Sequence, residues 1–137
     1  MGMDIRQFRV VLRARSFERT RRFYAEVLAL PQLGSWQGEG GRGALFEAGT
    51  GVVEVLGRPE EGVRGRDETF DYQGPQHKLT LSLVVPSAEK AYETLHFRDP
   101  NIPGGLSEDP DGGLQFATHD PDGVKILFRE AGDGERG

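Results

Sequence analysis

The stretch that decides the fold is Thr118–Phe128, which reads THDPDGVKILF. Two apolar runs flank a compact Asp-Pro-Asp-Gly turn, and this pattern predicts a β-hairpin. Asp and Pro favour the start of a turn, and glycine adopts the backbone conformation that other residues resist. The sequence therefore predicts one strand that ends at the turn and a last strand, VKILFRE, over residues 124–130.

The same kind of pattern extends from this hairpin toward the N-terminus. An alternating strand KLTLSLVV (78–85) precedes a helix PSAEKAYETLHF (86–97) that has Pro86 near its start. Two further strands, IPGGLSE (102–108) and GLQFATH (113–119), lead into the hairpin. The second half of the chain is thus predicted to run strand, helix, three strands.

The first half shows the same order. A strand FRVVLRA (8–14) alternates, with Arg9, Val11 and Arg13 on one face. Ser16 then looks like the cap of a helix that Pro31 ends, and three strands follow over 32–37, 42–48 and 51–57, joined by glycine-rich hairpin turns. We therefore predict an α+β fold of two βαβββ modules, at 1–57 and 78–130, with a linker over 58–77, a flexible tail over 131–137, and a single compact domain overall.

Composition narrows the function. The chain has 137 residues, a net charge of −5 and no cysteine, so thiolate metal sites and cysteine nucleophiles are excluded. The acidic balance argues against nucleic-acid binding, and no apolar run is long enough to span a membrane. The N-terminus lacks the apolar core of a secretory signal, so we expect a cytoplasmic protein.

The segments RRFYAEVLAL and HDPDGVKILF, in this element order, resemble the vicinal oxygen chelate superfamily, which includes glyoxalase I, extradiol dioxygenases and the fosfomycin and bleomycin resistance proteins. The resemblance runs from about Phe8 to Glu130. It implies modules that form incomplete barrels around a shared concave cavity, and a homodimer.

In metal-using members the resemblance implies four ligand positions, typically His or Gln, Glu, His and Glu. Here the first falls on Arg9, the second on Glu54, the third on Lys78 or Thr80, and the last on Leu127. Arginine stays protonated and leucine has no donor atom, so neither can bind a divalent cation. A catalytic metal site needs about three protein ligands. Even with His77 beside the third position, we expect no metal and no other cofactor.

The same positions suggest a ligand site. Glu54 lies in an apolar strand, opposite in direction to Val53 and Val55, so it is either a pocket carboxylate or the buried partner of Arg9. Arg13, near its strand end, is better interpreted as a solvated charge. Trp36 and Phe46 either form an aromatic wall for a flat or cationic ligand, or one or both pack against the core or the dimer partner. The predicted ligand-binding residues are Arg9, Trp36, Phe46, Glu54, Thr80 and Leu127.

The sequence thus predicts a metal-free protein of the glyoxalase/bleomycin-resistance type that sequesters a small molecule in the cavity between its modules. The alternative is an enzyme, a lyase, isomerase or dioxygenase relative, with an unusual metal site or with metal-free acid–base chemistry centred on Glu54.

Overall fold

The structure, a computed structural model, describes residues 2–59, 79–102, 105–108, 110 and 112–130. Its contacts divide the chain into two compact units, residues 1–73 and 74–137. Most of the predicted linker, the predicted tail, and both His77 and Lys78 lie outside the described residues.

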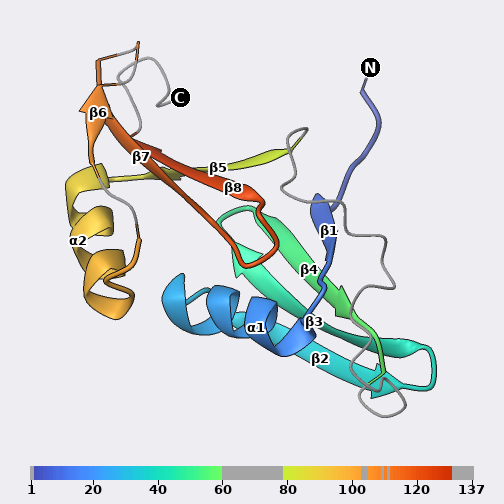
Figure 1. Cartoon of the computed structure of the whole chain (residues 1–137). Helices are drawn as coiled ribbons and strands as arrows, with labels where there is room; N and C mark the ends of the chain where they lie inside the picture. The colour runs from blue at the N-terminus through green and yellow to red at the C-terminus, as the bar shows by residue number, and fades with distance from the viewer. Residues whose placement is uncertain (1, 60–78, 103–104, 109, 111, 131–137) are drawn as a thin grey trace. The chain divides into compact units, whose positions relative to one another are not determined.

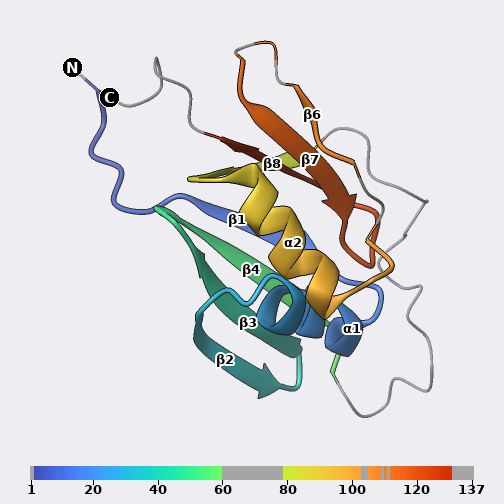
Figure 2. The same cartoon turned by 90° about the vertical axis from the view of Figure 1, so that its left-hand side faces the viewer.

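The first unit is a four-stranded sheet with one helical segment on one face (Figures 1 and 2). Its elements are β1 (Arg9–Arg13), α1 (Phe17–Arg22), a π-helical turn η1 (Phe23–Val27), β2 (Gln32–Gly38), β3 (Gly41–Ala48) and β4 (Gly51–Gly57). The strand order is β1-β4-β3-β2, with β1 parallel to β4 and the other pairs antiparallel. This is one βαβββ module.

Strand alternation gives this sheet a buried face that packs on the helix. The side chains of this face are buried, and they include Leu12, Ala44, Phe46, Val53 and Val55. The ring of Tyr24 lies 5.3 Å from Phe23 and 6.2 Å from Phe46 between centroids. The helix approaches the sheet so closely that a Cβ on Gly57 would collide with the side chain of Phe17.

The first helix ends differently from its predicted form. The sequence predicts one helix up to Leu30, but the last turn widens, and the amide of Leu28 donates to the carbonyl of Phe23 at 3.0 Å. Ala29 then has a positive φ of 56°, which reverses the chain before β2. Phe23 and Tyr24, at the start of this turn, are both buried.

The second unit repeats the arrangement. Its elements are β5 (Thr80–Val85), α2 (Ala88–Arg98), β6 (Ser107–Glu108), β7 (Leu114–His119) and β8 (Lys125–Glu130), in the sheet order β5-β8-β7-β6. Ser87 caps α2 by accepting from the amide of Lys90 at 3.1 Å. The rings of Phe116 and Phe128 stack 4.7 Å apart in its core.

The predicted fold class is confirmed: each unit is a βαβββ module, and within the described residues neither four-stranded sheet closes into a barrel. The shared concave cavity stays a prediction. The predicted strand over 102–108 is much shorter, because only Ser107–Glu108 pairs with β7 in the part of it that is described.

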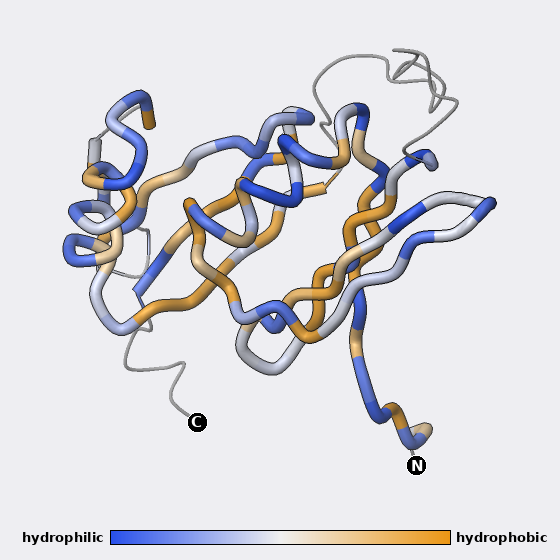
Figure 3. Tube along the Cα trace, turned by 90° about the horizontal axis from the view of Figure 1, so that it is seen from below, coloured by the Kyte–Doolittle hydropathy of each residue, from blue (hydrophilic) through white to orange (hydrophobic). Residues whose placement is uncertain are grey.

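The hydropathy of the residues agrees with this arrangement of strands and turns. In Figure 3 strands such as β4 are largely hydrophobic, and the tip of the β2–β3 hairpin is pale or hydrophilic. No helix in the described ranges is both long and apolar enough to cross a membrane.

Candidate functional site

The candidate site lies on the helix-free face of the first sheet, defined as the face that carries Glu54 and points away from α1. Strand pairing determines which residues share this face. Glu54 on β4 is opposite Val11 on the neighbouring strand β1 and opposite Leu45 on the neighbouring strand β3. Arg9 and Arg13 share this face because they lie two residues either side of Val11. The predicted grouping of Arg9, Arg13 and Glu54 on one face is therefore confirmed.

Arg9 and Glu54 form the predicted ion pair. The Nη1 atom of Arg9 lies 3.1 Å from Oε1 of Glu54, across the neighbouring strands β1 and β4. The Oε1 atom of Gln7 accepts from Nε and Nη2 of the same guanidinium at 3.0 Å and 2.7 Å. The side chain of Arg9 is 39% exposed and that of Glu54 is 15% exposed, so the pair is only half-buried.

This contact tests whether the metal implied by the family fits. At the first ligand position a guanidinium donates to the carboxylate that would be the second ligand. Arginine offers no lone pair to a cation, and its positive charge beside Glu54 would repel one. Elsewhere in the described part of the chain, no group of three or more His, Asp or Glu side chains gathers. The residues present do not fit the metal.

Trp36 also lies on the helix-free face, but Phe46 does not. Trp36 is opposite Gly43 in the β2–β3 pair, and the benzene half of its indole lies over Gly43, where a Cβ would collide with the ring. Phe46 pairs with Val53, is fully buried, and packs on Tyr24. Of the two interpretations given for Phe46, the structure supports the core one, because Phe46 and Gly43, which is opposite Trp36, point to opposite faces of β3.

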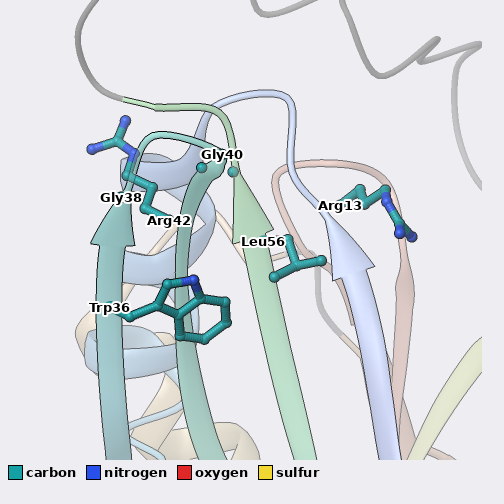
Figure 4. Close-up of a pocket in the computed structure, with 8 residues that line it drawn as sticks. Arg13, Trp36, Gly38, Gly40, Arg42 and Leu56 are labelled. Atoms are coloured by element: carbon teal, nitrogen blue, oxygen red, sulfur yellow. The ribbon is translucent and has the colours of Figure 1, made fainter.

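A pocket of about 410 Å³ opens at the end of this face, where β1 and β4 finish (Figure 4). Of the predicted ligand-binding residues, Trp36 alone contributes to its lining. Leu56 was not among the predicted ligand-binding residues and Arg13 was interpreted as a solvated charge, yet both line the pocket. The complete lining is Arg13, Trp36, Gly38, Gly40, Gly41, Arg42, Leu56 and Gly57.

Thr80 and Leu127 belong to the second unit. Thr80 pairs with Lys125 and Leu127 pairs with Ser82, so both side chains lie on the same face of the second sheet. Thr80 is exposed and Leu127 is half-buried. The predicted place of Leu127 in one ligand site with Arg9 and Glu54 stays a prediction.

Comparison with known proteins agrees with this architecture. The family model of the glyoxalase/bleomycin resistance protein/dioxygenase superfamily matches residues 6–128. This chain belongs to that superfamily.

Solved structures show the same fold at low identity. A glyoxalase/bleomycin resistance protein/dioxygenase from Nocardioides has a TM-score of 0.69 at 16% identity, over 100% of this chain and 90% of the other. The trypanothione-dependent glyoxalase I of Leishmania major has a TM-score of 0.66 at 18% identity, over 93% and 87%. A lactoylglutathione lyase from Agrobacterium tumefaciens has a TM-score of 0.61 at 17% identity, over 90% and 91%. No match was found among curated protein sequences.

The solvent exposure of the Arg9–Glu54 ion pair determines how much a mutation of either residue lowers the free energy of unfolding. Breaking a buried ion pair costs about 3–5 kcal/mol, but solvent screens a pair in which the Arg9 side chain is 39% exposed. In a double-mutant cycle with Arg9→Met and Glu54→Gln, we expect a coupling of about 0.5–1 kcal/mol from urea unfolding. A coupling above about 3 kcal/mol would mean that the pair is desolvated, and zero coupling would mean that it does not form in solution.

Proposed function

We propose that this chain is a small-molecule binding protein that works without the divalent metal of metal-using superfamily members. The ligand binds on the helix-free face of the first sheet. The observation that carries the proposal is the Arg9–Glu54 ion pair. Arg9 stands at the first metal-ligand position, and its cationic side chain binds the carboxylate of Glu54 at the second position.

The pocket at the end of the same face supports a binding role. Its volume of about 410 Å³ lies within the range of about 300–1,000 Å³ that is usual for small-molecule sites. An aromatic side chain, an aliphatic side chain and two arginines contribute to its lining. Such a mixture offers apolar contact area together with a group that orients the ligand.

The alternative is an enzyme that uses Glu54 for acid–base chemistry. One observation favours it, since the Glu54 carboxylate lies on the helix-free face and is 15% exposed, so a substrate can reach it. Against it, one carboxylate oxygen already accepts from Arg9. Turnover of a hemithioacetal or a catechol, lost in Glu54→Gln, would favour the enzyme.

Metal content tests the metal-free part of the proposal. Protein grown with zinc, nickel, manganese and iron in the medium is purified without chelators, unfolded, and analysed by elemental mass spectrometry. We expect far less than one equivalent of any transition metal, because Arg9 and Leu127 cannot ligate. One equivalent that survives dialysis would overturn the metal-free proposal.

Fragment screening tests the binding part. Ligand-observed NMR on the intact chain is compared with Trp36→Leu, and Phe97→Leu, at a side chain that is 87% exposed on α2, serves as the matched control. We expect fragments that bind the natural chain and the control but not Trp36→Leu. A library without any such fragment would overturn the proposed site. A homodimer and a cytoplasmic location remain part of the proposal, on the grounds given from the sequence.

A further inference from the structure

One row of four residues, one from each strand of the first sheet, crosses the region of the pocket, and all of them except Gly43 line it. Trp36 is opposite Gly43, Gly43 is opposite Leu56, and Leu56 is opposite Arg13. Neighbouring strands lie about 4.8 Å apart, so the row spans about 14 Å from the backbone of β2 to that of β1. Its chemistry changes in one direction, from an aromatic ring, through a position without a side chain and an aliphatic side chain, to a cation.

At the aromatic end of the row, the indole of Trp36 is fixed in position by the space above Gly43. Gly43 leaves room for the indole, which lies over it, and a Cβ at that position would push the ring away. Trp36 nevertheless remains 45% exposed, so part of the ring is available to a ligand. In Figure 4 the indole extends from β2 over β3 toward Leu56. A flat ring can stack on this surface and continue onto Leu56.

The other end of the row supplies positive charge. Of the two arginines that line the pocket, Arg42 is engaged elsewhere, because its guanidinium lies 4.8 Å from the centre of the Phe17 ring and donates to the carbonyl of Arg58 at 3.0 Å. Arg13 is exposed, and no ion pair or hydrogen bond of its side chain occurs among the described residues. In Figure 4 it extends from the end of β1 away from Trp36, and its flexible stem can turn back over Leu56.

No carboxylate lines the pocket in the described part of the chain, and the carboxylate nearest in the register on this face, Glu54, is neutralised by Arg9. Glu39 is exposed in the turn between the lining residues Gly38 and Gly40 but is not part of the lining, so the charged side chains that line the pocket, Arg13 and Arg42, are both cationic. A guanidinium binds a carboxylate, sulfonate or phosphate through paired hydrogen bonds.

From this row we propose that the pocket selects planar aromatic anions: the ring stacks on Trp36 and Leu56, and Arg13 binds the anionic substituent. The inference rests on the proposed function and specifies its ligand class. It makes Arg13 a specificity-determining residue.

The test compares two probes of the same shape, 1-naphthoate and its neutral amide, 1-naphthamide. Binding is followed by quenching of Trp36, which is the single tryptophan, and in parallel by ligand-observed NMR. For the natural chain we expect naphthoate to bind about tenfold more tightly than naphthamide. Cyclohexanecarboxylate, an anion without an aromatic ring, is expected to bind more weakly than either.

Two variants of matched chemistry locate the charge preference. Arg13→Gln should bind naphthoate about tenfold more weakly and naphthamide unchanged, and Arg19→Gln, at an exposed arginine on α1, should leave both affinities unchanged. Equal affinities for the two probes in the natural chain would overturn the inference, as would a preference that survives in Arg13→Gln. If naphthamide still binds in a manner that depends on Trp36, the aromatic site stands and only the anion preference fails. If neither probe binds, this inference fails while the fragment screen decides the binding proposal separately.

Discussion

Phe46→Ala is expected to lower the free energy of unfolding by about 3–5 kcal/mol. The side chain is fully buried between the sheet and the helical segment, and its ring packs on Tyr24 at 6.2 Å. Truncation removes the buried ring and leaves a cavity that a sheet fixed on both sides of β3 cannot close. Urea unfolding followed by circular dichroism measures the change.

Trp36→Ala is the matched control, because the sequence analysis placed both rings in the same ligand site. Trp36 is 45% exposed on an edge strand, so its truncation should cost less than half as much as that of Phe46. The ranking reverses for ligand binding, where Trp36 should matter and Phe46 should act only through stability. Equal losses of stability would contradict the assignment of the two rings to opposite faces.

The face of the sheet on which Phe46 lies could have been predicted from the sequence. The segment AGTG makes a two-residue hairpin turn at Gly49 and Thr50, with Ala48 opposite Gly51. Such a turn fixes the register of the whole pair, so Phe46 falls opposite Val53 and Leu45 falls opposite Glu54. The aromatic-wall interpretation treated residues on neighbouring strands as neighbours without applying this register.

Alternation within a single strand was enough for other predictions. It placed Glu54 opposite in direction to Val53 and Val55, and it placed Arg9 and Arg13 on the same face, because the period of two is a property of any strand. The Arg9–Glu54 contact was predicted because the family resemblance puts both residues at metal-ligand positions, and the neighbouring strands β1 and β4 do bring them together. Its exposure did not follow, because solvent access depends on the tertiary arrangement.

The pocket could not have been predicted from local patterns. It depends on a cross-strand row that joins residues 13, 36, 43 and 56, and on the collapse of Trp36 onto Gly43. Glycines in GEGG indicate a hairpin in the sequence, and that interpretation is correct for the turn between β2 and β3. The additional role of Gly43, which is to make room for a ring, is visible only when the neighbouring strand is in place.

Asp120→Ala is expected to lower the free energy of unfolding by about 2–4 kcal/mol, because the turn that decides the fold depends on this side chain. Its Oδ1 atom accepts from the amide of Asp122 at 2.8 Å and from the amide of Val124 at 2.9 Å, and the residue is buried. Alanine would leave both amides without this acceptor inside the turn, and buried donors without a partner are costly. The backbone bonds from Asp120 to Val124 and from Gly123 to Asp120 would remain, so the hairpin should weaken and not change its register.

Asp120→Asn separates the hydrogen bonds from the charge. Asparagine keeps a side-chain oxygen at the same position and is a common residue in such turns, so it should recover more than half of the stability lost in alanine. Thermal and urea unfolding of the three chains measure the ranking, and hydrogen exchange at the amides of Asp122 and Val124 locates the change. If alanine costs less than about 1 kcal/mol, or if asparagine is no better than alanine, the two bonds to Oδ1 do not hold the turn. The hairpin would then depend on Gly123, with its φ of 88°, and on the strand pairing alone.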